Sequence, residues 1–261
     1  MRANSKWALV VPIVLIALSA SPATQGGPAG TPVSEAAPKL AAFKTEAATS
    51  IDGMYDLAQQ MVDSVFSFSE IGFQEFETQR YLTAILEREG FTVQRGVAGI
   101  PTAWTARFGS GKPVIALGSD IDGIPQASQK PGVSYREPIV TGAPGHGEGH
   151  NSGQAVNIVA ALALKKIMTR EKMQGTIVIW PGVAEEQMAG KAYLVRSGLF
   201  KEADAALFTH VGSNFGVSWG QSAQMALISA EFNFRGQSAH AAGAPWRGRS
   251  ALDAATLMEV M

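Results

Sequence analysis

Three short apolar runs, each followed at once by acidic or histidine side chains, constrain the fold of this chain most strongly. The runs are Val114–Leu117, Thr176–Trp180 and Ala205–Phe208, and segments with helical periodicity lie between them. Strands that alternate with helices are typical of a parallel sheet, because a parallel pair of strands needs a crossover connection. We therefore predict an α/β fold with a largely parallel sheet and helices on both faces.

The helical segments are expected before the first run and between the first two. Ile51–Phe68, Phe76–Glu89 and Gly153–Arg170 carry apolar residues at helical spacing. Asn151 and Ser152 precede the third segment and are candidate caps, since their side chains can accept backbone N–H bonds. These helices would supply the layers that cover the sheet.

A different pattern begins near residue 225. Apolar and polar residues alternate over Ala226–Arg235, which indicates a half-exposed strand of an antiparallel sheet. A second domain is therefore expected to begin there. Ser250–Asp253 opens a helical pattern, and no helix stop precedes Met261, so we expect the chain to be the N-terminal part of a longer protein.

The first residues have the layout of a secretory signal peptide. Arg2 and Lys6 precede the apolar run Trp7–Leu18, and small residues follow in Ser19–Ala23. The run is shorter than the roughly 20 apolar residues of a spanning helix. We expect export to the periplasm or the medium with no stable membrane span after cleavage; the alternative is an uncleaved anchor. The expected organisation is a signal peptide (1–23), a linker and leading segment (24–50), a first domain (51–224) and the beginning of a second (225–261).

Composition excludes several classes of function. The chain has 261 residues, with 21 Lys and Arg against 22 Asp and Glu, a formal net charge of −1. This balance lacks the basic excess of a nucleic-acid-binding protein, so no nucleic-acid partner is expected. There is no cysteine, which excludes disulfides, thiolate nucleophiles and cysteine zinc sites. Any catalysis would therefore depend on histidines, carboxylates, hydroxyl groups or bound metal.

Candidate ligands lie where the three predicted strands end. Asp120 and Asp122 follow the first run, Glu185 and Glu186 follow the second, and His210 follows the third. Ligands of open α/β sheets bind outside the carboxyl ends of the strands, so these side chains are expected to share one site. Taken alone, each group has a simpler interpretation, because aspartates form turns and an acidic pair is common in an exposed turn.

A glycine-rich loop adds further candidates. In this loop His146, Glu148 and His150 are separated by glycines, which allow the chain to wrap around a cation. The spacing differs from the helical H-E-x-x-H zinc motif, and a polar surface loop is the alternative. Glu185 and Glu186 would point in opposite directions in extended chain. One carboxylate could then bind metal while the other accepts a proton from water.

His240 is a candidate in the predicted second domain. It lies in the small-residue segment Gly236–Ala242. A functional role would be contact with the substrate or an oxyanion across a domain cleft. The alternative is an ordinary histidine in an exposed loop.

Five motifs in a fixed order carry a family resemblance. They are Ser119–Pro125, Gly145–Asn151, Ala184–Glu186, Thr209–Val211 and Ser238–Ala242. Their order resembles that of the metal-dependent aminoacylase and carboxypeptidase family, and within it the amidohydrolase branch that acts on aminobenzoyl-glutamate and on auxin–amino acid conjugates. The resemblance spans roughly residues 51–261; the combination is specific, although each motif alone is weak.

The resemblance implies a role for each matching residue. Glu185 would be the general base and Asp122 a supporting catalytic residue. Glu148 stands where this branch usually has cysteine, and a carboxylate is a harder donor than a thiolate. Two divalent ions, zinc or manganese, are therefore expected, and His146 receives no role. The implied metal ligands are Glu148, His150, Glu186 and His210, and the implied substrate contact is His240.

The resemblance also implies a function. A catalytic α/β domain, interrupted by an inserted α+β lid or dimerisation domain, would hydrolyse the amide bond of N-acyl or N-aroyl amino acids through a metal-activated water. The partners would be a small-molecule or short peptide-like substrate and a second copy in a homodimer. The alternatives are a metal-binding pseudoenzyme or inactive fragment, and an exported two-metal aminopeptidase.

Overall fold

The computed structural model describes residues 38–220, 228 and 230–260. The chain divides into two compact units, residues 1–42 and 43–261, and the structure describes only residues 38–42 of the first. The predicted signal peptide therefore lies outside the described residues. The helices and strands are α1 (Pro38–Asp52), α2 (Tyr55–Phe68), α3 (Phe76–Arg88), β1 (Thr92–Arg95), η1 (Val97–Gly99), β2 (Trp104–Ser110), β3 (Val114–Asp120), α4 (Gly153–Glu171), β4 (Gly175–Gly182), α5 (Glu185–Met188), α6 (Lys191–Arg196), β5 (Ala205–Phe208), η2 (Pro245–Arg247) and α7 (Ala251–Val260).

The five strands form one mixed sheet in the order β1-β2-β4-β3-β5. β3 pairs in parallel with both β4 and β5, which confirms the α/β class. β2, which the sequence patterns did not indicate, pairs antiparallel with β1 and β4. The carboxyl ends of the three parallel strands consequently meet at one edge, where the candidate ligands follow.

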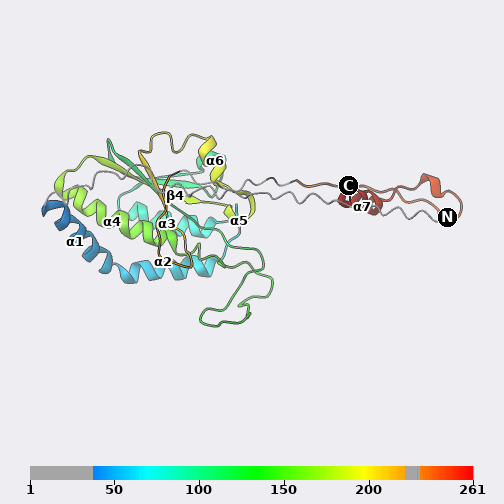
Figure 1. Cartoon of the computed structure of the whole chain (residues 1–261), viewed down its shortest axis with the longest axis horizontal. Coiled ribbons are helices and arrows are strands. Elements are labelled where there is room, and N and C mark those ends of the chain that lie inside the picture. The colour runs from blue at the N-terminus through cyan, green and yellow to red at the C-terminus, as the bar shows by residue number, and fades with distance from the viewer. Residues whose placement is uncertain (1–37, 221–227, 229, 261) are drawn as a thin grey trace, which may run out of the picture. The chain divides into compact units, whose positions relative to one another are not determined.

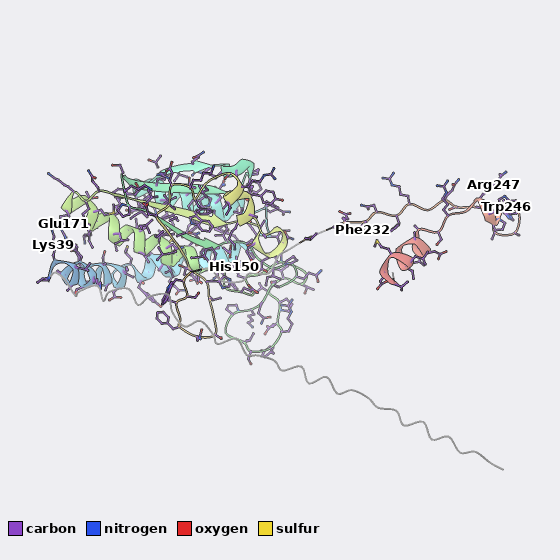
Figure 2. The ribbon with its side chains drawn as sticks, turned by 45° about the horizontal axis from the view of Figure 1, so that its top comes forward. Lys39, His150, Glu171, Phe232, Trp246 and Arg247 are labelled. Carbon is purple, nitrogen blue, oxygen red and sulfur yellow. The ribbon has the colours of Figure 1, made fainter. Side chains whose placement is uncertain are left out.

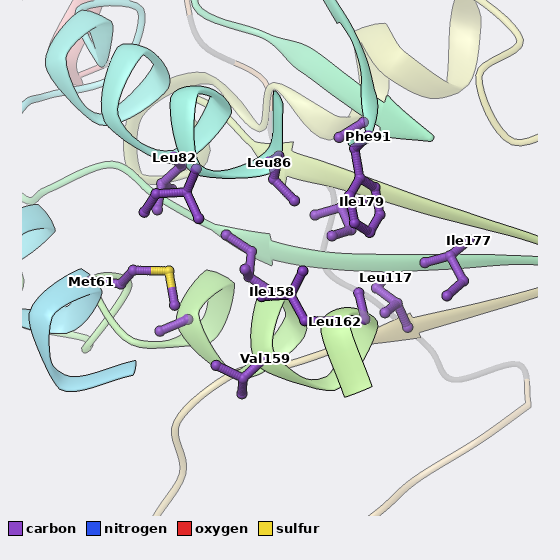
Figure 3. Packing of buried hydrophobic residues seen from close by; sticks show 14 of the residues in the cluster. Met61, Leu82, Leu86, Phe91, Leu117, Ile158, Val159, Leu162, Ile177 and Ile179 are labelled. Atoms are coloured by element: carbon purple, nitrogen blue, oxygen red, sulfur yellow. The ribbon is translucent and has the colours of Figure 1, made fainter. Parts of the chain in front are cut away.

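Helices cover both faces of the sheet, as predicted. Figure 1 shows α2, α3 and α4 on one side of β4 and α6 on the other. Every residue of β4 is buried, and successive side chains point to opposite faces. Ile177 and Ile179 join the core beneath α2, α3 and α4, which Figure 3 shows, whereas Val178 and Trp180 pack on the other side with Leu194 of α6.

Several helix boundaries differ from the sequence patterns. The helix expected over Ile51–Phe68 is divided, because α1 ends at Asp52 and α2 begins at Tyr55. α1 also occupies the later part of the segment expected as linker and leading chain. Ser152 is at the N-cap position of α4, but its hydroxyl donates to the Gly149 carbonyl and caps no N–H group. None of the described helices is both long and apolar enough to cross a bilayer.

The expected strand over Ala226–Arg235 is absent from its described residues. Positions 226, 227 and 229 lie outside the description, and residues 228 and 230–235 form no strand. A strand needs a neighbour for its backbone groups, and in this described segment the pairing is the single bridge between Gln237 and Arg249. The helix opened by Ser250 is confirmed as α7, with the Ser250 hydroxyl accepting the Asp253 N–H. The second domain stays a prediction.

Candidate metal centre

The register of the parallel strands brings the candidate residues to one edge. Asp120, the last residue of β3, lies opposite Gly182, the last residue of β4. The neighbouring β5 ends at Phe208, and the Thr209 N–H donates to the Gly118 carbonyl at 2.9 Å. A Cβ atom on Gly182 would lie 1.8 Å from Oδ1 of Asp120, so only glycine leaves room for this carboxylate.

Two imidazole rings form the centre of the site. Nε2 of His150 lies 3.1 Å from Nε2 of His210, and His150 is buried within the helix-and-sheet body (Figure 2). Nδ1 of His150 lies 3.1 Å from the Asp122 carbonyl oxygen, and Nδ1 of His210 lies 2.7 Å from the Val211 carbonyl oxygen.

These contacts assign the tautomers of the two rings. A carbonyl oxygen only accepts hydrogen bonds, so each Nδ1 carries the proton and each neutral ring presents a lone pair on Nε2. Two lone pairs so close together repel unless a proton or a metal ion lies between them. Backbone carbonyls that orient Nδ1 in this way are the usual outer partners of metal-ligating histidines.

Carboxylates surround the two rings. Oε2 of Glu148 lies 3.9 Å from Nε2 of His150 and 3.8 Å from Nε2 of His210. Oε1 of Glu186 lies 3.8 Å from Nδ1 of His150. The described residues contain two donor groups, one of Glu148, His150 and Glu186 and one of Asp120, His150 and His210, with ligand atoms within 4.8 Å of one another. The structure thus brings together all four metal ligands implied by the resemblance, and with them Asp120, which the sequence offered as a candidate at the end of the first run.

The residues present fit a divalent cation. Among the described atoms, Oδ1 of Asp122 and Oε1 of Glu186 are buried with no hydrogen-bond partner. Burial, together with the charges of Glu148, Asp122 and Glu185, raises the pKa of Glu186 to about 6, although His150 opposes this shift. A bound cation would satisfy the oxygens and offset the repulsion. Imidazole and carboxylate donors suit zinc, and manganese accepts the carboxylates readily.

The pKa of His150 is also perturbed. Burial alone would lower it, but the bond with Asp122 and the charges of Asp120, Asp122 and Glu186 together raise it. The site therefore attracts a cation, either a proton on this ring or a metal ion.

Glu185 and Glu186 diverge, but not for the reason the sequence suggested. The pair begins the one-turn helix α5 and is not extended, so the extended-chain argument is wrong. Neighbouring side chains on a helix are about 100° apart. Glu186 faces His150, whereas Oε1 of Glu185 lies 3.9 Å from Nζ of Lys191. Neither donor group of the described residues includes Glu185, and its role as general base stays a prediction.

Asp122 and Lys191 form hydrogen bonds that hold residues of the site in position. Oδ2 of Asp122 accepts the Glu186 N–H at 3.0 Å, so this residue contacts both a histidine and an acidic ligand. Lys191 donates to both oxygens of Asp120, at 2.6 and 2.8 Å. Burial raises the pKa of Asp120, and Lys191 opposes that shift. Sequence reasoning missed Lys191, because a lysine that begins a helix usually faces solvent.

The remaining two histidines lie outside the donor groups found in the described part of the chain. Nε2 of His146 donates to the Val65 carbonyl at 3.0 Å, which ties the glycine-rich loop to α2. Burial lowers the pKa of His146 to about 4, so this ring is neutral at pH 7. His240 is exposed in a turn where its Nδ1 accepts the Gly243 N–H at 2.8 Å. Its contact with substrate stays a prediction.

Curated relatives place the chain in a family. No family model matches it. A p-aminobenzoyl-glutamate hydrolase subunit from Escherichia coli is 40% identical over 198 residues, which cover 76% of this chain and 41% of that protein. Mouse Xaa-Arg dipeptidase is 28% identical over 233 residues, 87% of this chain and 51% of that protein. The chain belongs to the metallopeptidase and amidohydrolase family. An IAA-amino acid hydrolase of Arabidopsis thaliana, ILR1-like 5, is a more distant relative at 27% identity over 66% of this chain and 39% of that protein.

Solved structures agree with this family fold. A putative aminohydrolase from methicillin-resistant Staphylococcus aureus matches with a TM-score of 0.55 and 22% identity, over 64% of this chain and 42% of that one. A Bacillus subtilis dinuclear metal-binding peptidase from the M20 family matches with a TM-score of 0.50 and 24% identity, over 61% and 44%. At such identities the likeness shows the fold alone. The chain spans about half or less of the length of the curated relatives that it matches.

Proposed function

We propose that this protein is a metal-dependent amidohydrolase or peptidase that hydrolyses the amide bond of N-acyl or N-aroyl amino acids, with aminobenzoyl-glutamate as the reference substrate. One observation carries the proposal: the Nε2 atoms of His150 and His210 lie 3.1 Å apart among carboxylates, of which Oδ1 of Asp122 and Oε1 of Glu186 are buried with no hydrogen-bond partner among the described residues. The name of the E. coli relative supports the substrate class.

The residues divide the chemistry between them. His150, His210, Glu186 and Glu148 would hold the metal, zinc or manganese. That two ions bind is proposed from the family resemblance, because the single lone pair of His150 can bind only one of them. When bound, a divalent ion would polarise the substrate carbonyl and lower the pKa of water toward neutrality. Glu185 accepts the proton of the attacking water and delivers it to the leaving amine.

Asp122 keeps this arrangement in place. Its backbone carbonyl fixes the tautomer of His150, and its carboxylate holds the N–H of Glu186. Asp122 therefore acts on two of the proposed metal ligands at once.

A substrate panel tests the proposal. The protein, loaded with Zn²⁺ or Mn²⁺, is offered aminobenzoyl-glutamate, N-acetylated amino acids and unblocked dipeptides. We expect chelator-sensitive hydrolysis of the acylated substrates. A preference for unblocked dipeptides would instead favour an aminopeptidase or dipeptidase, and bound metal with no turnover on any substrate would favour a pseudoenzyme.

We also propose that the protein is exported and works as a homodimer in which His240 contacts substrate. The order of charged, apolar and small residues over 1–23 supports export, and the family resemblance supports the dimer. N-terminal sequencing of protein recovered from the periplasm or medium tests the first proposal, with cleavage near residue 23 expected. Light scattering tests the second, and a monomeric mass would contradict it.

A further inference from the structure

The turn before the acidic pair is strained. Ala184 has φ 51° and ψ 38°, the left-handed region that residues other than glycine rarely adopt. A strained residue of this kind persists only where its surroundings hold it. Because Glu185 and Glu186 follow directly, whatever holds Ala184 also sets the direction of both carboxylates.

Two carboxylates from distant segments hold this turn. Glu75 is fully buried, and its Oε1 accepts the Ala184 N–H at 2.7 Å. Asp122 accepts the Glu186 N–H at 3.0 Å. The backbone is therefore fixed on both sides of Glu185, once from the start of α3 and once from the end of β3.

Helix α3 does not need the Glu75 side chain as its N-terminal cap. It is at the N-cap position of α3 but makes no side-chain cap bond. Glu70 caps the helix instead, since its carboxylate accepts the N–H groups of Glu77 at 2.8 Å and Thr78 at 2.9 Å. Burying a carboxylate is costly. Burial raises the pKa of Glu75, which Thr102 and the Ala184 N–H oppose, and Oε2 has no hydrogen-bond partner among the described residues. The Ala184 N–H is therefore the backbone group of the site that this buried side chain holds.

A glycine allows the segment that carries Glu75 to pack closely against the Ala184 turn. A Cβ atom on Gly72 would lie 2.6 Å from Cα of Ala184, so glycine allows the segment before α3 to approach the turn. This close approach brings Glu75 within reach of the Ala184 N–H.

We infer that Glu75 is a positioning residue of the metal centre, whose carboxylate holds the Ala184 turn so that Glu186 faces His150 and Glu185 lies beside Lys191. The inference rests on the proposed function. It concerns a hydrogen-bond acceptor at a fixed position, not the charge of Glu75.

Three variants separate positioning from general stability. Glu75→Gln keeps an acceptor at the same reach, Glu75→Asp withdraws it by one methylene, and Thr83→Ala removes another buried side chain of α3, one that donates to the Gln79 carbonyl away from the turn. We expect Glu75→Asp to weaken Zn²⁺ binding about tenfold, or about 1.4 kcal/mol, and to lower kcat with KM unchanged. Glu75→Gln should stay within about threefold, and Thr83→Ala should lower the unfolding midpoint but not Zn²⁺ affinity.

Amide exchange at Ala184 reads the contact directly. We expect its exchange to accelerate in Glu75→Asp and to stay slow in Glu75→Gln. A folded Glu75→Asp chain with unchanged Zn²⁺ affinity and unchanged Ala184 exchange would overturn the inference. If Glu75→Asp does not fold, Glu75→Gln provides the test. Retained Zn²⁺ affinity in Glu75→Gln would support the acceptor role of residue 75. A tenfold loss of Zn²⁺ affinity while the Ala184 amide still exchanges slowly would overturn the inference. Wild-type chain that binds no Zn²⁺ would refute the proposed function itself.

Discussion

The ion pair between Lys191 and Asp120 should make a large contribution to the stability of the metal-free protein. Asp120 is 1% exposed, and both of its oxygens accept bonds from Lys191, at 2.6 and 2.8 Å. Lys191→Met keeps most of the aliphatic stem but removes the ammonium group. The substitution would leave a buried carboxylate whose remaining partner is the His150 ring, with Nε2 at 4.0 Å from Oδ2 of Asp120.

The magnitude follows from the burial of the pair. Removing one partner of a buried ion pair costs about 3–5 kcal/mol. The Lys191 side chain is 32% exposed, so water already screens part of the interaction and we expect a loss at the lower end, about 3 kcal/mol. For a unit of this size that loss lowers the unfolding midpoint by roughly 6–12 °C.

The loss should depend on pH with a definite sign. Burial already raises the pKa of Asp120 in the folded protein, and loss of the ammonium group raises it further. A carboxyl group whose pKa is raised by folding destabilises the folded state above that pKa, and the penalty vanishes once the group is protonated in both states. The deficit of Lys191→Met should therefore be largest at neutral pH and shrink on acidification.

Urea unfolding in the presence of EDTA measures this directly. The wild type, Lys191→Met, the double variant Lys191→Met/Asp120→Asn and the exposed-lysine control Lys201→Met are compared at pH 7.5 and 5. The double variant should recover most of the loss, because no unpaired charge is left. A loss below about 0.5 kcal/mol at pH 7.5, or a double variant no more stable than Lys191→Met, would refute the reasoning.

Three further predictions concern catalysis, pH and the core. Glu185→Gln should lower turnover by ~10²–10⁴ while metal content measured by mass spectrometry stays at the wild-type level; unchanged turnover would exclude the base assignment. Folding lowers the pKa of His146 to about 4. The contribution of the neutral ring to the free energy of unfolding should therefore be complete above the unfolded pKa of about 6.5 and fall by about 3 kcal/mol as the pH drops to 4. In urea titrations of the metal-free protein, His146→Gln should flatten this dependence of the unfolding free energy on pH, and an unchanged dependence would contradict the prediction. Leu82 is fully buried in the core between the helices and the sheet. Leu82→Ala should therefore lower the free energy of unfolding measured by calorimetry by about 2–5 kcal/mol without changing metal affinity. A loss under about 1 kcal/mol would argue against this packing.

The part of the site that sequence reasoning could reach is the part that strand topology determines. Apolar runs predict strands, parallel strands end at the same edge, and the residues that follow must then meet there. Asp122, Glu186 and His210 were found in this way, and His150 through its glycine-rich loop. Such reasoning needs no knowledge of side-chain contacts.

The residues that were missed act across the fold. Glu75 and Lys191 look like ordinary polar residues at helix starts, and only the folded structure shows that they contact Ala184 and Asp120. The sequence patterns missed β2, which pairs antiparallel with both of its neighbours, because this strand carries few consecutive apolar residues. The helical start at Glu185 depends on the left-handed Ala184, which no local pattern indicates.

The most direct test of the central claim is a titration of the metal-free chain with Zn²⁺ and Mn²⁺. His150 belongs to both donor groups, so the wild type should bind at least one ion, and His150→Ala should weaken binding by about 100-fold or more, of the order seen when metal-site partners are lost. His240→Ala, a histidine outside both groups, is the matched control and should bind as the wild type does. Wild-type chain that binds neither ion, or His150→Ala that binds as tightly as the control, would contradict the account.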